Sequence, residues 1–229
     1  MSDIKANVAA IKERMAKAAE RFGRKPEEIE LVAVTKTVPV ERIREALAAG
    51  IRHLGENRVQ ELVAKYGELG AAAQWHLIGH LQTNKVKYIV DKVTLVHSLD
   101  RWSLAEELEK RAAAQGRVIP VLLQVNIAEE ETKFGLRRQE VIPFLEKIIP
   151  LSHLQVRGLM TIAPLVEDPE EVRPVFRSLF RLAQEIDRRR YPGVEMRYLS
   201  MGMTGDYEVA IEEGANMVRI GTGIFGERA

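Results

Sequence analysis

A regular alternation of short apolar segments with amphipathic segments constrains the fold of this chain more than any other feature. Short apolar segments bounded by glycine, proline and polar residues are typical of buried strands. They predict strands near 31–36, 51–55, 75–78, 93–97, 118–125, 154–159, 195–199 and 216–220. Helical spacing of apolar residues predicts helices at 3–22, between Pro39 and Gly50, and near 57–68, 83–91, 101–115, 138–149, 169–190 and 204–213.

Strands that alternate with helices form parallel sheets, and a chain of 229 residues is close to the size of a TIM barrel. We therefore expect an α/β fold, a single-domain (β/α)8 TIM barrel over residues 1–229 in which the additional N-terminal helix completes the outer ring. No linker or low-complexity segment divides the chain. Alternation alone leaves a doubly wound open sheet as the alternative.

Charge and composition restrict the class of function. The 34 basic residues are offset by 33 acidic ones, so there is no general electrostatic case for nucleic acid or an anionic membrane as a partner. Cysteine is absent, which excludes disulfides and thiolate metal sites and fits the reducing cytoplasm. No segment reaches the roughly 18 apolar residues of a membrane span, and the charged N-terminus predicts no signal peptide.

The apolar strand at 31–36 reads Leu-Val-Ala-Val-Thr-Lys and ends on Lys36. A buried amine is costly unless it is deprotonated, paired or used in a covalent bond. A lysine at a strand end commonly extends its ammonium group to water. The alternative is an amine that captures a carbonyl group as a Schiff base.

The loops after the last two predicted strands are rich in small residues. Ser-Met-Gly-Met-Thr follows at 200–204, and Arg219 precedes Gly-Thr-Gly at 221–223. Barrels often bind a phosphate group at these two loops, because small residues let backbone N–H groups approach an anion closely. A glycine turn after a final strand is common without any such role. The helix expected near Thr204 directs its positive end to the same place.

Arg219 lies on the same strand face as Met217 and Gly221. Two roles are open to it: it pairs with an acid such as Glu56 or Glu208, or it faces a ligand. In the second case its guanidinium group donates to a ring nitrogen and leaves that nitrogen unprotonated.

His76 and His80 are four residues apart, but a predicted strand and Gly79 place them off a helix. Packing or a loop hydrogen bond is therefore expected for them rather than a metal site.

The sequence resembles the pyridoxal phosphate homeostasis proteins, also called the YggS or PROSC family, nearly from end to end. The matching segments are Leu-Val-Ala-Val-Thr-Lys-Thr at 31–37, Gly-Glu-Asn-Arg-Val-Gln-Glu at 55–61, Trp-His-Leu-Ile-Gly-His-Leu-Gln-Thr-Asn-Lys at 75–85, His-Ser-Leu-Asp at 97–100, Lys-Phe-Gly at 133–135, Arg-Gly-Leu-Met-Thr-Ile at 157–162, Ser-Met-Gly-Met-Thr at 200–204 and Val-Arg-Ile-Gly-Thr-Gly-Ile-Phe-Gly at 218–226. The fold of this family is similar to the N-terminal barrel of alanine racemase.

The resemblance implies pyridoxal 5′-phosphate as the cofactor, held as a Schiff base on Lys36. It also implies Ser200, Gly221 and Thr222 as phosphate contacts, Arg219 as the partner of the pyridine nitrogen and Asn57 as a polar residue near the cofactor. Thr204, Gly205 and Gly223 depart from the residues most often found in the family, and Thr204 keeps the hydroxyl group.

Two functions fit these residues. The first is a monomeric carrier that buffers or delivers the cofactor in vitamin B6 homeostasis, with apo pyridoxal-phosphate-dependent enzymes as possible recipients. The second is a pyridoxal-phosphate-dependent enzyme acting on amino acids, such as a racemase. A ring nitrogen held by Arg219 is a poor electron sink, and we expect no room after Gly221 for the second domain that barrel racemases use. Both points favour the carrier, although Tyr198 or Tyr207 remains available as a second base.

Overall fold

The computed structural model describes residues 3–227, and its centre is a closed barrel of eight parallel strands in sequence order, β1-β2-β3-β4-β5-β6-β7-β8. The strands are β1 (Glu30–Val34), β2 (His53–Glu56), β3 (Gln74–Leu77), β4 (Leu95–Leu99), β5 (Ile119–Gln124), β6 (Leu154–Met160), β7 (Tyr198–Ser200) and β8 (Met217–Ile220). Pairing of β1 with β8 closes the ring. The expected TIM barrel is confirmed, and the open doubly wound sheet is excluded.

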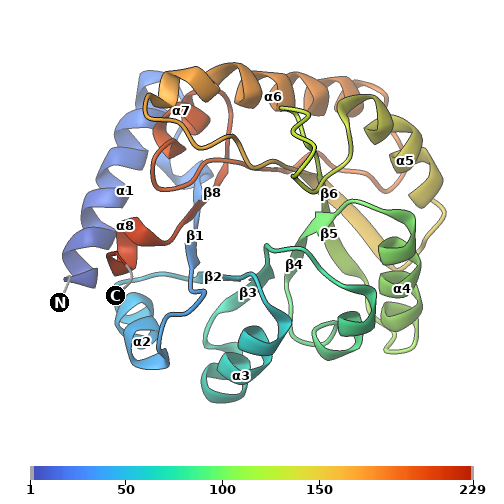
Figure 1. Ribbon diagram of the computed structural model, residues 1–229, viewed down its shortest axis with the longest axis horizontal. Helices are drawn as coiled ribbons and strands as arrows, with labels where there is room; N and C mark the ends of the chain where they lie inside the picture. The colour runs from blue at the N-terminus through green and yellow to red at the C-terminus, as the bar shows by residue number, and fades with distance from the viewer. Residues whose placement is uncertain (1–2, 228–229) are drawn as a thin grey trace.

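Helices surround the barrel, as Figure 1 shows. The α-helices are α1 (Ile4–Arg21), α2 (Val40–Ala48), α3 (Val59–Leu69), α4 (Trp102–Ala113), α5 (Val141–Ile148), α6 (Arg173–Arg188), α7 (Tyr207–Glu212) and α8 (Thr222–Phe225). The 3-10 helices are η1 (Pro26–Glu28), η2 (Gly70–Ala72), η3 (Thr83–Tyr88), η4 (Arg138–Glu140) and η5 (Pro169–Val172).

The extra N-terminal helix α1 packs beside α7 and α8 and covers the seam between the first and last strands (Figure 1). The side chain of Asp3 accepts a hydrogen bond from the backbone N–H of Ala6, as expected of an N-cap. The buried face of α1, which includes Ile4, Val8 and Ile11, joins the main apolar core between strands and helices. Helix α1 therefore takes the place of an eighth outer helix.

Three expected segments differ from the structure. The strand that contains Leu31 ends at Val34, so Lys36 lies in the following turn and not in the strand. The helix expected near 83–91 is the shorter 3-10 helix η3. The helix expected to open near Thr204 begins at Tyr207, because Met203 to Asp206 form a turn in which the N–H of Met203 donates to the side chain of Asp206.

The barrel interior is unusually polar along one path. Apolar residues that include Val32, Leu95 and Met217 form a small cluster inside the ring, separate from the main core. Alternation along each strand places histidine, serine and arginine side chains on the same inner face. The polar residues within or next to this cluster are His53, His76, His97, Ser200 and Arg219.

Candidate functional site

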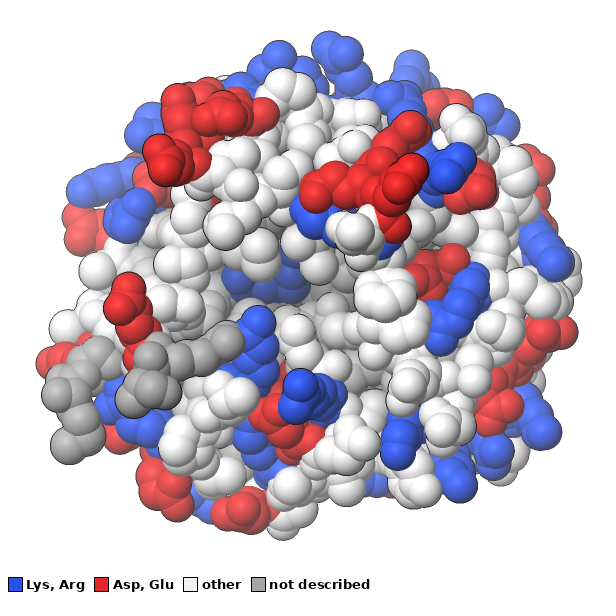
Figure 2. All heavy atoms as spheres, in the orientation of Figure 1, with Lys and Arg blue, Asp and Glu red and all other residues white. Residues whose placement is uncertain are grey.

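Lys36 lies in the turn after β1, at the carboxyl end of the barrel, where barrel enzymes place their active sites. It lines two hollows of about 470 and 430 Å³. Gly221 and Thr222 line both hollows, and Arg219 lines the second. The face shown in Figure 2 is hollowed at its centre, with Lys or Arg atoms inside the hollow. Four of the six predicted site residues thus lie around one cavity.

Helix α3 fixes the turn that carries Lys36. The ammonium group of Lys65 donates to the carbonyl oxygen of Thr35 at 2.6 Å, and Glu61 accepts a hydrogen bond from the N–H of Thr37 at 2.7 Å. The turn needs this support because Thr37 has a φ of 62°, a left-handed conformation that a β-branched residue rarely adopts. Neither Lys65 nor Glu61 was identified from the sequence as a residue of the site.

A buried carboxylate completes this support. Glu56, at the end of β2, accepts hydrogen bonds from Lys65 at 2.7 Å and from the hydroxyl of Thr35 at 2.6 Å. Burial raises the pKa of Glu56, while its contacts with Lys65 and Thr35 act in the opposite direction. Glu56 therefore supports the turn that carries Lys36, through Thr35 and Lys65, and is not the partner of Arg219.

Arg219 is 3% exposed and projects into the barrel from β8. One terminal nitrogen donates to the hydroxyl oxygen of Ser200 at 2.6 Å, and the other donates to the backbone carbonyl of Thr161 at 2.8 Å. Burial lowers the pKa of Arg219 to about 10, and the charge of nearby Asp206 opposes that shift, so the guanidinium group stays charged at neutral pH. Of the two roles left open for Arg219, the ion pair with Glu56 or Glu208 is excluded, because Glu56 pairs with Lys65 and Glu208 pairs with Arg14 on α1.

Ser200 is completely buried at the end of β7. Besides accepting from Arg219, its hydroxyl group lies 3.0 Å from Nδ1 of His97. His97 is the third of three linked histidines, a feature that was not predicted from the sequence. The sequence did contain an indication of this series, because each of three successive predicted strands contains one histidine.

The loops after β7 and β8 are joined at their tips, where the N–H of Gly223 donates to the hydroxyl of Thr204 at 3.3 Å. A Cβ atom added to Gly221 would lie 3.3 Å from Cβ and 3.4 Å from the carbonyl oxygen of Val34, so the glycine lets β8 pass closely beside the end of β1. This close approach brings the last loop next to the Lys36 turn.

Asn57 directly follows β2, and the oxygen of its side chain is buried without a hydrogen-bond partner among residues 3–227. A Cβ atom at Gly79 would lie 2.4 Å from the carbonyl oxygen of Asn57, so the loop after β3 packs directly on it. A buried, unpaired amide oxygen is costly and is consistent with a polar ligand nearby.

The two tyrosines considered as a second base lie elsewhere. Tyr198 opens β7 and interacts with Glu30 at the start of β1, at the opposite end of the barrel from Lys36. Tyr207 faces α1, where the guanidinium group of Arg14 lies 5.4 Å from the centre of its ring.

The two histidines noted in the sequence are also separated. His76 lies inside the barrel, whereas the ring of His80 stacks on Phe134 with ring centres 4.0 Å apart. Within residues 3–227 no group of three or more acidic or histidine side chains is arranged to hold a metal ion.

A closed barrel with a lysine after its first strand and small-residue loops after its last two defines a fold class. The family described as alanine racemase, N-terminal domain, matches residues 6–229. An alanine racemase of Clostridium difficile superposes with a TM-score of 0.77 at 15% identity, over 99% of this chain and 57% of the racemase. That likeness concerns the fold alone.

Nearer relatives share the whole length of the chain. The pyridoxal phosphate homeostasis protein of Aquifex aeolicus is 49% identical over 96% of both chains, and that of Escherichia coli is 40% identical over 100% of this chain and 98% of its own. The structure of PipY from Synechococcus elongatus with PLP bound has a TM-score of 0.81 and 38% identity, over 93% of this chain and 100% of PipY. The chain therefore belongs to the family of pyridoxal phosphate homeostasis proteins.

Proposed function

We propose that this protein binds pyridoxal 5′-phosphate as a Schiff base on Lys36 and buffers or delivers the cofactor, with no substantial turnover of its own. The proposal rests on one observation above all. The amine-bearing Lys36 and the buried Arg219 line a single cavity together with Gly221 and Thr222. The names of the relatives and the PLP bound to PipY support the same ligand.

The groups around the cavity suit the ligand's chemistry. Lys36 supplies a primary amine for the aldehyde, and their condensation releases one water molecule. Both terminal nitrogens of Arg219 are held by Ser200 and Thr161, which fixes the plane of the guanidinium group and leaves other N–H groups, the Nε–H among them, to donate to a ring nitrogen. The small residues Gly221 and Thr222 let backbone N–H groups approach a phosphate. Ser200 and Asn57 complete the proposed contacts.

Bound pyridoxal phosphate supplies an electron sink, and its strength depends on protonation of the ring nitrogen. Arg219 only donates hydrogen bonds, so it keeps that nitrogen unprotonated and the sink weak. Neither Tyr198 nor Tyr207 lines the two hollows that Lys36 lines, so neither provides a second base there. This chemistry favours holding the cofactor over transforming an amino acid.

The remaining parts of the proposal concern the protein as a whole. We propose residues 1–229 as one cofactor-binding barrel domain that acts as a monomer in the cytoplasm. Apo enzymes that require pyridoxal phosphate are the proposed recipients. Within residues 3–227, no helix is both long and apolar enough to cross a membrane. Light scattering coupled to gel filtration tests the monomer, and activation of an apo enzyme by the loaded protein tests delivery.

The central experiment maps the covalent link. The protein is incubated with pyridoxal 5′-phosphate, reduced with borohydride and digested, and the modified lysine is found by mass spectrometry. We expect the pyridoxyl group on Lys36 and its absence in Lys36→Ala. Lys133→Ala is the matched control, because Lys133 lines the same cavity and pairs with Glu130. An undiminished adduct in Lys36→Ala would falsify the assignment of the amine.

A second assay separates the carrier from an enzyme. The loaded protein is incubated with a panel of amino acids, and racemised or deaminated products are measured. We expect no sustained turnover. Robust turnover that disappears in Lys36→Ala contradicts the carrier and supports a pyridoxal-phosphate-dependent enzyme.

A further inference from the structure

A continuous series of polar side chains crosses the inside of the barrel. We call it the interior chain, and its members, in order, are Glu30, His53, His76, His97, Ser200 and Arg219. Nδ1 of His53 lies 3.0 Å from Nε2 of His76, and Nδ1 of His76 lies 2.9 Å from Nε2 of His97. With the 3.0 Å contact between Nδ1 of His97 and the hydroxyl of Ser200, hydrogen bonds connect all three rings, which is the arrangement that proton transfer between rings requires. Nε2 of His53 lies 3.7 Å from Glu30, within ion-pair distance.

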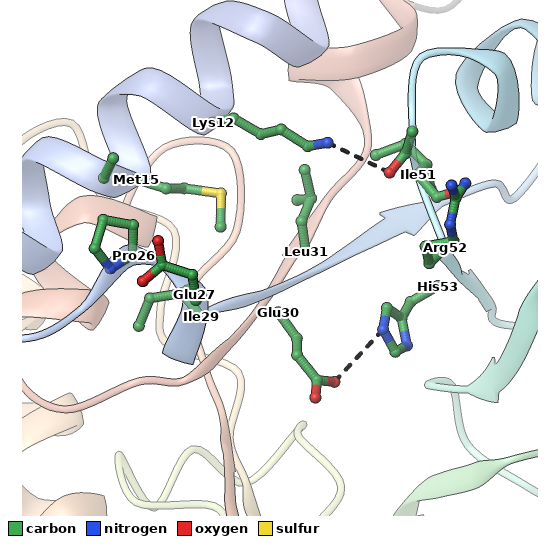
Figure 3. Close-up of a pocket in the computed structure, with 12 residues that line it drawn as sticks. Lys12, Met15, Pro26, Glu27, Ile29, Glu30, Leu31, Ile51, Arg52 and His53 are labelled. Atoms are coloured by element: carbon green, nitrogen blue, oxygen red, sulfur yellow. Dashed lines mark hydrogen bonds and ion pairs between the residues drawn. The ribbon is translucent and has the colours of Figure 1, made fainter.

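The interior chain joins two different surfaces. Its Arg219 end lies at the cavity that contains Lys36. Its other end, Glu30 and His53, lines a pocket of about 460 Å³ on the opposite face. Figure 3 shows these two side chains pointing toward one another from β1 and β2. A carboxylate oxygen of Glu30 lies 3.7 Å from Nε2 of His53. His76 and His97 between the two ends are shielded from solvent.

The two ends define one direction of donation along the interior chain. Arg219 can only donate, so the hydroxyl oxygen of Ser200 accepts from it, and the proton of that hydroxyl has Nδ1 of His97, 3.0 Å away, as its acceptor. His97 then donates from Nε2 to His76, and His76 donates from Nε2 to His53. His53 in turn presents its Nε2–H to Glu30, an acceptor-only carboxylate. The facing oxygen of Glu30 has no hydrogen-bond partner within residues 3–227.

A phosphate contact by Ser200, which is part of the proposed function, requires the opposite direction. If the hydroxyl of Ser200 donates to a ligand oxygen, Nδ1 of His97 has to carry a proton. Every bond between rings then reverses, and His53 carries protons on both nitrogens. The reversed chain holds one proton more than the first, and the positive charge lies beside Glu30.

We propose that the interior chain is a proton-transfer path, and that an anionic ligand bound at Ser200 reverses it with uptake of one proton from the solvent. Ser200 passes its proton to Nδ1 of His97 and receives one from the anionic ligand, which takes up a proton from the solvent in its place, because Ser200 itself is completely buried. The Nε2 proton of His97 moves to His76, and that of His76 moves to His53. At Ser200 one O–H bond is broken and one is formed, and His53 becomes an imidazolium ion.

The surroundings of the chain support this charge movement. Burial, with the neighbouring His76 and Arg219 charges, lowers the pKa of His97 well below its ordinary value, so the charge does not stay at that end. His53 is only partly buried. Burial still lowers its pKa below the ordinary value, but the Glu30 carboxylate opposes that shift, so a positive charge costs less at His53 than at His97. The titratable groups packed around His53 are Glu30 from β1, His76 from β3 and Tyr198 beside Glu30 on β7, and Lys12, Glu27 and Arg52 line the same pocket.

Calorimetric titration with pyridoxal 5′-phosphate near neutral pH, in two buffers of different ionisation enthalpy, counts the protons taken up per ligand. We expect wild type to take up more than His53→Gln, by a difference approaching one proton. The glutamine side chain keeps a hydrogen-bonding amide but cannot carry the charge. His153→Gln, which removes a partly exposed histidine outside the chain, serves as the control and should match wild type. Equal uptake in wild type and His53→Gln overturns the proposal.

Two further measurements keep the test decisive. Glu30→Gln removes the carboxylate that stabilises the charged ring, so its proton uptake should also fall, whether or not His53→Gln folds. Nitrogen-15 NMR of the imidazoles should show His76 protonated on Nε2 in the free protein and on Nδ1 in the complex, and an unchanged tautomer contradicts the reversal. If pyridoxal phosphate does not bind at all, the proposed function fails. If it binds with no difference in protons, only the interior chain's role fails.

Discussion

The ammonium group of Lys65 lies 2.7 Å from a carboxylate oxygen of Glu56, and the Glu56 side chain is completely buried. Lys65 also donates to the carbonyl oxygen of Thr35, next to Lys36 in sequence. One buried ion pair thus connects helix α3 to the turn that carries the proposed Schiff-base amine. Breaking the pair affects both the stability of the fold and the position of that amine.

We predict that Lys65→Met lowers the free energy of unfolding by about 3–5 kcal/mol, because Glu56 is left buried without its counter-charge. Urea denaturation followed by circular dichroism measures the loss. Lys17→Met is the matched control, since the Lys17–Glu13 pair on α1 is exposed at both ends and its loss should be much smaller. Similar losses in the two variants would show that the buried Lys65–Glu56 pair contributes no more to the free energy of unfolding than an exposed pair does.

The second prediction concerns acid pH. Burial lowers the pKa of His76 from 6.5 to about 3, so the folded protein keeps this ring neutral while the unfolded chain protonates it. The unfolded state therefore binds more protons between these pKa values, and stability is lost as pH falls from 6.5 toward 3. The contribution is about 1.4 kcal/mol per pH unit.

Urea denaturation at a series of pH values tests this linkage. His76→Gln should reduce the slope of the unfolding free energy against pH by about 1.4 kcal/mol per pH unit, which corresponds to one proton. It should also lower stability at neutral pH. His153→Gln removes a partly exposed ring and should leave most of the slope unchanged. A slope in His76→Gln equal to that of wild type would mean that His76 is not neutral in the folded protein.

The third prediction concerns the loop after β7. Gly202 has a φ of 92°, and an added Cβ atom would lie 2.6 Å from Cβ of Ala210 and 2.9 Å from Cα of Tyr207. Its carbonyl oxygen accepts a hydrogen bond from the backbone N–H of Arg219 at 3.0 Å. Gly202→Ala should therefore destabilise the fold by about 1–3 kcal/mol and weaken pyridoxal phosphate binding, because the clash displaces the strand end that carries Arg219.

Gly205→Ala provides the comparison within the same loop. Nothing lies within 4 Å of a Cβ atom added there, so this variant should unfold like wild type; it is a control for stability only, because Gly205 itself lines the cavity that contains Lys36. Thermal denaturation measures stability, and absorbance titration measures binding by Gly202→Ala. Equal stability of the two alanine variants would contradict the proposed packing of Gly202.

The sequence was sufficient to predict the barrel architecture and the succession of its strands and helices, because buried strands and amphipathic helices have distinct periodic patterns of apolar residues. It also predicted that Arg219 shares a strand face with Met217, which the structure confirms by placing both inside the ring. The partners of Arg219 could not be predicted. Ser200 is 19 residues away and Thr161 is 58, and only closure of the barrel brings them together.

The interior chain was missed for a related reason. His76 and His97 lie in predicted strands, but strand register decides whether successive inward-facing residues meet. In the structure His53 pairs in register with Gln74, and His76 pairs with Leu95. His76 and His97 therefore each lie two residues beyond the register partner of the preceding histidine, which is the next inward-facing position of the strand. That diagonal stagger belongs to the shear of a closed barrel, which no local pattern encodes.

The last prediction concerns the turn that follows Lys36. Thr37 has a φ of 62°, which L-residues adopt at a cost of roughly 1–2 kcal/mol and glycine adopts freely. Thr37→Gly should therefore be more stable than Thr37→Ala by about 1 kcal/mol, although both keep the N–H that donates to Glu61. Because glycine also loosens the turn, the same variant should retain pyridoxal phosphate less well than Thr37→Ala during dialysis. Urea denaturation and the absorbance of the retained cofactor measure the two effects. If Thr37→Gly gains stability with no loss of retained cofactor, rigidity of this turn is not needed to hold the ligand on Lys36.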